Sequence, residues 1–212
     1  MENVKKTPLY EKHVEARGKM IDFAGWMMPV EYSGILPEHH AVRNAAGIFD
    51  VSHMGEVDVK GKDAEKFVQN LVTNNVALME ERQVIYCMMC YQDGGVVDDL
   101  LVYKHHREHY LLVINAGNID KDFDWMRKNS AGFQVELTNL SSGIGEVALQ
   151  GPKAQEILQL LTRKDLSEIK FFYFDPKVEI AGIECLVSRT GYTGEDGFEI
   201  YVPPEEAPRI WN

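Results

Sequence analysis

The sequence predicts an α+β fold of two related lobes, each an antiparallel sheet with flanking helices. Two observations carry this prediction. The first is an internal repeat, since residues 55–71 and 145–161 are identical at seven of seventeen positions without a gap. Each copy has the pattern of a strand, a glycine turn and an amphipathic helix, which indicates a duplicated subdomain. The second is Asp93-Gly94, a dipeptide typical of hairpin turns, between two strand-like segments.

The composition is that of a globular protein with an excess of negative charge. The chain has 212 residues, of which 45% are hydrophobic, enough for a sizeable core. Its net charge of -11 argues against binding to nucleic acid or to acidic membrane surfaces. No stretch approaches the ~18 consecutive apolar residues of a transmembrane helix, and the N-terminus lacks the apolar run of a signal peptide. With only three cysteines, we expect a cytoplasmic protein.

The N-terminal part of the chain predicts two helices. Residues 7–16 form the first, because Thr7 is a good N-cap and Pro8 suits the first helical position. Residues 37–46 form the second, which we expect to end at Gly47 in the left-handed conformation that follows many helices.

The middle of the chain alternates between strand and helix patterns. Residues 48–61 are strand-like, and residues 62–73 have apolar side chains at helical spacing. A short helix is expected after Pro203-Pro204. The remaining expected elements are strands over 84–91, 96–103 and 109–115 and a helix over 118–129.

The strand over 96–103 carries two adjacent carboxylates, Asp98 and Asp99. Aspartate is depleted in strands, and burying a carboxylate without a partner costs on the order of several kcal/mol. Alternation places the two side chains on opposite faces, so they cannot act as a close catalytic dyad. Asp99 shares its face with Tyr103 and is the candidate for a pocket, whereas we expect a structural hydrogen bond for Asp98. The alternation puts Val97, Asp99, Leu101 and Tyr103 on one face and Val96, Asp98, Leu100 and Val102 on the other.

Two motifs match the sequence patterns of known sites but lack the structural context that those sites require. Cys87 and Cys90 form a CxxC, but a redox pair needs a helix start and a zinc site needs more ligands. We therefore interpret both cysteines as structural. Residues 105–109 match HxxEH, but that chemistry requires one helix, and here the segment links two strands. We accordingly predict no metal site.

The glycine-rich segment 191–202 leaves two interpretations open. It lacks the Lys-Ser/Thr pair of a phosphate-binding loop, and Glu195 and Asp196 would repel phosphate. The segment is either a tight turn or a backbone-lined wall around an uncharged ring. In the second case Tyr192 would stack on the ring and Glu199 would accept hydrogen bonds from its NH groups.

Six stretches together resemble one family, the aminomethyltransferases of the glycine cleavage system, also called T-proteins. They span nearly the whole chain in order, and FDVSHM (49–54) together with GYTGEDG (191–197) is specific to that family. The six stretches are residues 7–32, 38–57, 94–103, 115–123, 149–156 and 188–200.

This resemblance implies a folate-dependent enzyme. Members of the family transfer the methylene carbon of an aminomethyl group from the lipoyl arm of the H-protein to tetrahydrofolate, and they release ammonia. The second aspartate of the family's DD pair falls on Asp99, with the implied role of fixing the pterin and assisting its N5 in attack on the aminomethyl carbon. The other folate contacts that the resemblance implies are Met54, Tyr86, Tyr103, Asn115, Tyr192 and Glu199.

The family fold is a cloverleaf of three domains, two of them α+β and the third a C-terminal β-barrel. Members are longer than the 212 residues of this chain, so we expect the N-terminal portion of the enzyme without the barrel. The expected domains are a discontinuous first lobe, 1–53 with 141–212, and a ferredoxin-like second lobe, 54–140.

Three other functions stay open at this point. A folate-binding iron–sulfur repair protein would carry a KGCYxGQE-type loop with a cysteine, which residues 191–197 lack. A folate-dependent demethylase domain, as in sarcosine oxidation, usually belongs to a longer chain with a flavin domain. An inactive fragment would bind the carrier protein without forming the folate product.

Overall fold

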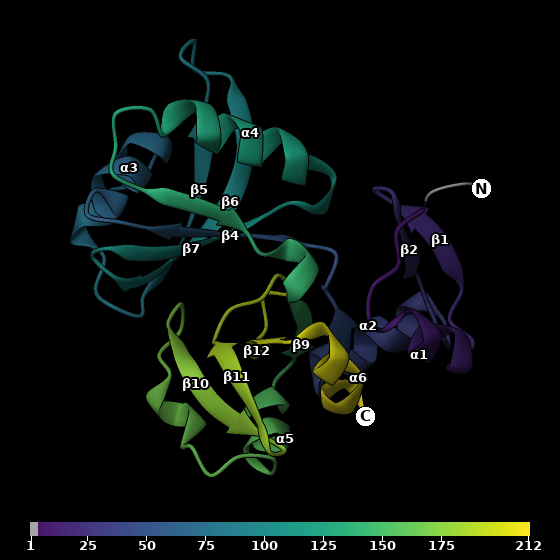
Figure 1. Ribbon diagram of the computed structural model, residues 1–212. Coiled ribbons are helices and arrows are strands. Elements are labelled where there is room, and N and C mark those ends of the chain that lie inside the picture. Colours follow the sequence, from purple (N-terminus) through teal and green to yellow (C-terminus); the bar gives the residue numbers. More distant parts are fainter. Residues whose placement is uncertain (1–3) are drawn as a thin grey trace. The chain divides into compact units, whose positions relative to one another are not determined.

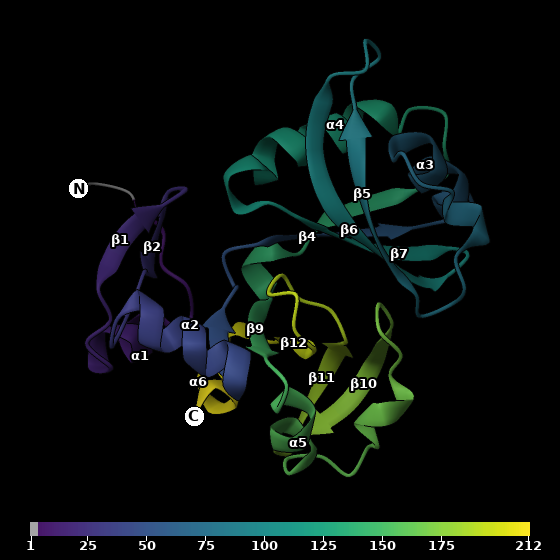
Figure 2. The ribbon, with the colours of Figure 1, turned by 180° about the vertical axis from the view of Figure 1, so that it is seen from behind.

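The computed structural model describes residues 4–212, and the chain divides into two compact units. Unit 1 contains the described residues up to His53 together with Gly143–Asn212, and unit 2 contains Met54–Ser142. Figures 1 and 2 show the elements of both units from opposite sides. No helix in this described part of the chain is long and apolar enough to cross a membrane.

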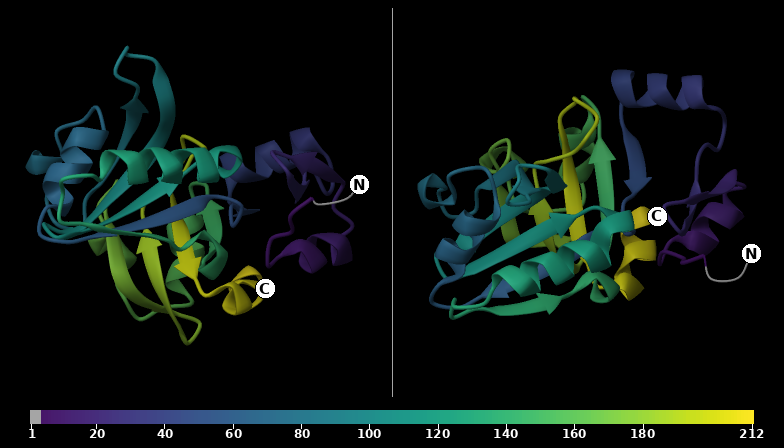
Figure 3. Two further views of the ribbon diagram at one scale, coloured as in Figure 1. Left: turned by 45° about the horizontal axis from the view of Figure 1, so that its top comes forward. Right: turned by 90° about the horizontal axis from the view of Figure 1, so that it is seen from above.

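Unit 2 is a five-stranded sheet with two helices on one face. The strand order is β5-β6-β7-β4-β8, and every neighbouring pair is antiparallel. Helix α4 lies along the strands, as the green helix of Figure 3 shows. The elements are β4 (Gly55–Lys60), α3 (Ala64–Leu71), the 3-10 turn η1 (Val76–Leu78), β5 (Val84–Cys90), β6 (Val96–His106), β7 (His109–Ile114), η2 (Ala116–Asn118), α4 (Ile119–Asn129) and β8 (Glu136–Asn139).

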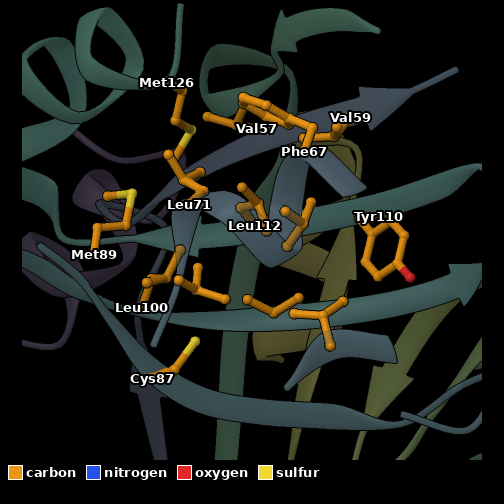
Figure 4. Packing of buried hydrophobic residues seen from close by; sticks show 14 of the residues in the cluster. Val57, Val59, Phe67, Leu71, Cys87, Met89, Leu100, Tyr110, Leu112 and Met126 are labelled. Carbon is orange, nitrogen blue, oxygen red and sulfur yellow. The ribbon is translucent and has the colours of Figure 1, made fainter. Parts of the chain in front are cut away.

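The core of unit 2 lies between this sheet and the two helices. Phe67 of α3 and Met126 of α4 are fully buried against strand residues such as Val57 and Leu112 (Figure 4). Burial of each large apolar side chain contributes roughly 1.5–3 kcal/mol, so the helices are held mainly by this face. The helical spacing predicted for residues 62–73 is confirmed, because α3 buries Ala64, Phe67, Val68 and Leu71.

Unit 1 contains a second five-stranded antiparallel sheet, in the order β10-β11-β12-β9-β3, and a separate two-stranded hairpin, β1-β2. Its core packs the helix α5 and the C-terminal helix α6 against the larger sheet. The elements are α1 (Tyr10–Glu15), β1 (Met20–Phe23), β2 (Trp26–Pro29), α2 (Ile35–Asn44), β3 (Gly47–Asp50), η3 (Ser141–Gly143, at the boundary of the units), β9 (Gly145–Gln150), α5 (Ala154–Gln159), η4 (Leu166–Glu168), β10 (Phe174–Ile180), β11 (Ile183–Ser188), β12 (Gly197–Val202), η5 (Pro204–Glu206) and α6 (Ala207–Trp211).

The two large sheets have the same strand order, which confirms two related lobes. β9, β10, β11 and β12 occupy the places of β4, β5, β6 and β7, and β3 occupies the place of β8. The difference lies in the chain path: β8 is the last strand of unit 2, whereas β3 precedes the rest of its sheet by almost a hundred residues of sequence, a gap that unit 2 fills.

Two glycines of the internal repeat have the same structural role in both units. Gly61 and Gly151 follow the first strand of each copy at φ +140° and +131°, a conformation that favours glycine. A Cβ at Gly61 would lie 2.1 Å from the carbonyl oxygen of Gln134, and one at Gly151 would lie 2.6 Å from that of Ala45. In both units, therefore, the absence of a side chain at this glycine lets the segment before the edge strand, β8 or β3, pass close to the glycine backbone.

The repeated glutamines have equivalent roles as well. Gln69 Oε1 accepts a hydrogen bond from the backbone N–H of Ala77 at 3.1 Å. Gln159 Oε1 accepts one from the N–H of Leu166 at 3.0 Å. Each side chain thus ties the repeat helix to the 3-10 turn that follows it.

Two boundaries predicted near the N-terminus are wrong. The first helix begins at Tyr10 rather than Thr7, because the Thr7 hydroxyl donates to Asp50 Oδ2 at 2.6 Å and does not cap the helix. The second helix is Ile35–Asn44, and Gly47 begins β3 instead of ending the helix.

The early start of the second helix has a local cause in one carboxylate. Glu38 Oε1 accepts hydrogen bonds from the backbone N–H groups of Tyr32, Ser33 and Gly34, at 2.7, 2.5 and 2.9 Å. These bonds hold the turn before the helix, and Gly34 takes φ +123° there. Burial acts to raise the pKa of Glu38, but the three backbone hydrogen bonds outweigh it and lower the pKa.

The other predicted elements correspond to observed ones. Residues 48–61 contain two strands rather than one, β3 and β4. The strands predicted over 84–91, 96–103 and 109–115 are β5, β6 and β7, and the helix over 118–129 is η2 with α4. The hairpin at Asp93-Gly94 is confirmed, with Gly94 at φ +88°.

Candidate functional site

The two aspartates of β6 point to opposite faces of the unit 2 sheet, as predicted. Asp98 faces α4, where it is 7% exposed, and Asp99 is half-buried on the opposite face. The predicted partition fails at Val97, which lies in the helix-side core together with Leu100. The reason is a register shift: Met89 pairs with Asp98, but the next β5 residue pairs with Val96, so β6 has one extra residue.

Asp99 is held through both of its carboxylate oxygens. Tyr86, on the neighbouring strand β5, donates its hydroxyl to Asp99 Oδ2 at 2.9 Å. Asn115, at the end of β7, donates from Nδ2 to Asp99 Oδ1 at 3.2 Å and to the Asp99 carbonyl at 3.1 Å. Tyr86 is 53% exposed, so this acceptor group lies at an accessible part of the sheet. Its geometry suits a carboxylate that accepts hydrogen bonds while remaining open to a ligand.

Asp98 has the structural hydrogen bonds expected for it. Its Oδ1 accepts from Asn115 Nδ2 at 3.1 Å, and its Oδ2 accepts from Asn118 Nδ2 at 3.0 Å. Burial acts to raise the pKa of Asp98, but the hydrogen bonds from Asp122, Asn118 and Asn115 outweigh it and lower the pKa. Asp98 is therefore an anion, and the amide of Asn115 bridges it to Asp99.

Two side chains of this group, Asn118 and Asp122, were not predicted from the sequence. Both lie on the segment of η2 and α4 that follows Asn115, and a spacing of three and four residues brings one helical face toward β6. The spacing of these polar residues, close to a strand that carries carboxylates, could have indicated the contact with β6. It was not recognised because the same helix face also carries the apolar residues Ile119 and Met126, which indicate packing in the core.

Two other predicted site residues, Met54 and Tyr103, belong to unit 2. Met54 is half-buried in the turn just before β4. Tyr103 lies on the same β6 face as Asp99 and is fully buried. The observed contacts thus bring Tyr86, Asp99 and Asn115 together.

The glycine-rich loop belongs to unit 1, and arginines neutralise its acids. Asp196 accepts from Arg189 through both oxygens, at 2.8 and 2.6 Å, and Glu195 accepts from Arg43 at 2.9 Å. Gly191 has φ +156°, and a Cβ there would lie 1.9 Å from the side-chain oxygen of Gln150. The segment is therefore a tight turn whose two acids are paired within unit 1, and its role as a wall around an uncharged ring stays a prediction.

The two predicted site residues of this region differ in accessibility. Tyr192, at the tip of the turn, is 99% exposed. It lines a cavity of about 750 Å³ in unit 1, together with Tyr32, Phe49 and Trp211. Glu199, on β12, accepts a short hydrogen bond from the hydroxyl of Thr190. Tyr192 thus offers a free aromatic face, whereas Glu199 is already engaged within the unit.

The cysteines and the metal-like motif show no reactive geometry. Cys87 is buried in the unit 2 core, and burial raises the pKa of its thiol to about 12, the opposite of a redox-active cysteine. Cys90 and Cys185 are free thiols as well. His105 and His109 lie on adjacent strands with their rings stacked at 4.2 Å. Within residues 4–212 no group of three or more His, Cys, Asp or Glu side chains is arranged to hold a metal ion.

The chain is similar to known aminomethyltransferases in sequence. The profile of the GCVT N-terminal domain matches residues 9–212. The chain is 60% identical over 211 residues to the aminomethyltransferase of Alkaliphilus metalliredigens and 62% identical over 211 residues to that of Caldanaerobacter subterraneus subsp. tengcongensis. These alignments cover 100% of this chain but 57% and 56% of the relatives. The chain therefore spans little more than half of their length.

Solved structures give the same result at the level of the fold. The crystal structure of glycine cleavage system aminomethyltransferase T from Bartonella henselae matches with a TM-score of 0.89 and 34% identity, covering 98% of this chain and 56% of that chain. A heterotetrameric sarcosine oxidase from Corynebacterium sp. U-96 matches with a TM-score of 0.60 and 13% identity, covering 95% of this chain and 88% of that chain. At this identity the second match concerns the fold alone.

Proposed function

The chain belongs to the family of the GCVT N-terminal domain, and on this premise we propose that it is the N-terminal portion of a tetrahydrofolate-dependent aminomethyltransferase of the glycine cleavage system. The reaction moves the methylene carbon of an aminomethyl group from the lipoyl arm of the H-protein to tetrahydrofolate. Its products are methylenetetrahydrofolate, ammonia and a dihydrolipoyl arm.

The observation that carries this proposal is the geometry of Asp99. Its carboxylate is oriented by Tyr86 and Asn115, yet it remains half-buried at an accessible part of the sheet. A carboxylate held in this way accepts hydrogen bonds from ring N–H groups and can take up or release a proton at the reacting nitrogen. Positioned acid–base groups of this kind contribute typically 10²–10⁴-fold to a rate.

In the proposed mechanism Asp99 orients the pterin so that its N5 is the nucleophile toward the aminomethyl carbon. As the carbon–nitrogen bond breaks, the amine takes up the proton that N5 loses and departs as ammonia. N10 then attacks the same carbon, the carbon–sulfur bond to the lipoyl arm breaks, and the thiolate takes up the proton that N10 loses. Tyr86 and Asn115 keep the Asp99 carboxylate in one orientation throughout, so little reorganisation is needed during the reaction.

The remaining predicted folate contacts are part of the proposal, and local chemistry supports each of them differently. The exposed ring of Tyr192 suits stacking on a pterin, and the carboxylate of Glu199 suits its N–H donors. Met54 offers a polarizable side chain beside β4. Tyr103 is the least accessible, so its contribution is to support the face that carries Asp99.

The proposed partner is the lipoylated H-protein, and the proposed compartment is the cytoplasm. Cys87, Cys90 and Cys185 are all unpaired thiols, as in proteins of a reducing environment. The net charge of -11 argues against nucleic acid as a partner.

The proposal is tested with Asp99→Asn, which keeps the size of the side chain and removes its charge. Calorimetric titration of tetrahydrofolate into the chain should show binding that the substitution weakens by about tenfold or more. Asp93→Asn is the matched control, because Asp93 lies in the exposed hairpin of the same sheet. It should bind like the wild-type chain.

The same pair of variants should be made in the full-length protein and assayed for methylenetetrahydrofolate with aminomethyl-lipoyl H-protein. We expect Asp99→Asn to reduce transfer by about 100-fold or more, with Asp93→Asn unchanged. An Asp99→Asn enzyme that transfers at the wild-type rate would show that the carboxylate has no part in the reaction.

A further inference from the structure

One buried carboxyl group behind the Asp98–Asp99 pair has no part in the reaction described so far. Asp122 lies on α4, and its side chain is 0% exposed. Its Oδ1 accepts from Lys121 Nζ at 2.6 Å, and the same Nζ donates to the carbonyl of Val97 at 2.6 Å. No donor within residues 4–212 reaches Asp122 Oδ2. An ionised Asp122 would therefore leave a buried anionic oxygen without a hydrogen bond, which is costly.

A proton on Asp122 resolves this cost, because Asp98 lies against it. The two carboxyl groups are close enough to share a hydrogen bond. Asp98 already accepts from Asn115 and Asn118, which both donate and thereby favour its anionic form. The proton of the pair accordingly belongs to Asp122, which becomes the donor to Asp98. Burial, with the adjacent Asp98 as a further cause, raises the pKa of Asp122 to about 7, although Lys121 opposes the shift.

We propose that Asp122 is a positioning residue for Asp99: its protonated carboxyl donates a hydrogen bond to Asp98, and Asp98 in turn holds the Asn115 amide against Asp99. Asn115 Nδ2 lies 3.1 Å from Asp98 Oδ1 and 3.2 Å from Asp99 Oδ1, so one nitrogen links the two carboxylates. The inference rests on the proposed function only for the role of Asp99. The chain of contacts from Asp122 to Asp99 stands without it.

The arrangement has a consequence for pH dependence. The titratable groups that face Asp122 are Asp98 from β6 and Lys121 from its own helix. When Asp122 loses its proton, two adjacent carboxylates repel each other, and Lys121 compensates for one of them only in part. Asp98 then shifts, and Asn115 loses the acceptor that keeps its amide directed at Asp99.

Three substitutions separate this role from simple packing. Asp122→Asn keeps a hydrogen-bond donor toward Asp98 but cannot titrate. Asp122→Ala removes the donor altogether. Asp120→Asn is the matched control, because it removes the same charge from an exposed position of the same helix.

The first measurement follows the side-chain amide of Asn115 by ¹H–¹⁵N NMR between about pH 5.5 and 8.5. The wild-type chain and Asp120→Asn should show a titration of this signal near pH 7. Asp122→Asn should show none. A titration that persists in Asp122→Asn, or its absence in the wild-type chain, would overturn the inference. Because this signal does not involve folate, it decides the inference even if the proposed function is wrong.

The second measurement is tetrahydrofolate affinity on either side of that titration. Wild-type affinity should fall by about tenfold as pH rises through 7, and Asp122→Asn should keep the higher affinity throughout. Asp122→Ala should be weaker by about tenfold at both pH values, and if it does not fold, Asp122→Asn alone decides. A wild-type chain that binds tetrahydrofolate at neither pH contradicts the proposed function, and the Asn115 signal still tests the role of Asp122.

Discussion

The hydroxyl of Tyr86 donates to Asp99 Oδ2 at 2.9 Å, from a neighbouring strand rather than from a loop. β5 and β6 are paired antiparallel along their lengths, so the position of Tyr86 relative to Asp99 is set by the register of the sheet. The carboxylate proposed to be catalytic is thus oriented by a rigid element, which favours a constant geometry.

We predict that Tyr86→Phe reduces aminomethyl transfer in the full-length protein by about fivefold to tenfold, because Asp99 loses one of its two side-chain donors. The free energy of unfolding should change by less than about 1 kcal/mol, since the ring of Tyr86 is half exposed. The measurements are the initial rate and a urea titration. Tyr91→Phe is the control, because Tyr91 lies beyond the same strand and packs against Trp125 at 4.9 Å. Equal rates for both variants would contradict the role given to Tyr86.

For the two repeated glycines we predict equivalent effects on the free energy of unfolding. Gly61→Ala and Gly151→Ala should each lower the free energy of unfolding by about 2 kcal/mol or more, because both have positive φ and face backbone atoms that cannot move aside. Gly143→Ala is the control, because a Cβ there meets nothing within 4 Å. The comparison is made by denaturant unfolding. A strong effect at only one of the two repeat positions would contradict their equivalence.

Glu56 makes stability depend on pH. Burial raises the pKa of this residue to about 9, and its Oε2 has no hydrogen-bond donor within residues 4–212. An acid whose folded pKa exceeds its unfolded pKa binds a proton more tightly in the folded state. Stability is therefore lost as pH rises from about 4.5 towards 9.

Glu56→Gln should remove this loss, so the variant should be more stable than the wild-type chain at pH 8 by on the order of 2–4 kcal/mol. The gap should shrink as pH falls to about 5. Urea midpoints measured across this range test the prediction, with Glu136→Gln as the control at an exposed position of the adjacent strand. A gap that does not vary with pH would show that Glu56 is already ionised in the fold.

For Asp50, in unit 1, we predict the opposite dependence of stability on pH. Its carboxylate accepts from Thr7 Oγ1 at 2.6 Å and from the Ser52 N–H at 3.0 Å, and it pairs with His13 Nε2 at 2.8 Å. Burial acts to raise the pKa of Asp50, but its hydrogen bonds with His13, Thr7 and Ser52 outweigh it and lower the pKa. The stabilisation is thus present above the unfolded pKa and is lost as pH falls through the folded one.

We expect Asp50→Asn to cost about 2–4 kcal/mol of the free energy of unfolding at neutral pH and progressively less in acid. Thermal or urea unfolding at several pH values measures this difference. Asp22→Asn, at an exposed position of β1, should be nearly neutral. If Asp50→Asn costs as much in strong acid as at neutral pH, the ionised form of Asp50 is not the stabilising one.

Local patterns sufficed for the elements with strong periodicity. The amphipathic spacing of α3 and the opposite orientation of Asp98 and Asp99 depend only on near neighbours, so they were predictable from the sequence. The extra residue of β6 that places Val97 in the core was not predictable in this way. The N-terminal helix boundaries were not either, because they depend on side-chain hydrogen bonds that periodicity does not reveal, locally at Glu38 and with the distant Asp50 at Thr7. Threonine is a residue type typical of an N-cap, but the hydroxyl of Thr7 donates its hydrogen bond to the buried Asp50 instead.

The sequence by itself determined that the chain repeats one strand–turn–helix unit and that Asp98 and Asp99 point to opposite faces. Both follow from local patterns, because the direction of a side chain in a helix or strand is set by the period of that element. Only the tertiary structure decided that β3 completes the sheet of unit 1, and that Asp122 on α4 lies against Asp98. These relations depend on contacts between residues far apart in sequence, and such contacts form only when sheets and helices pack around a common core.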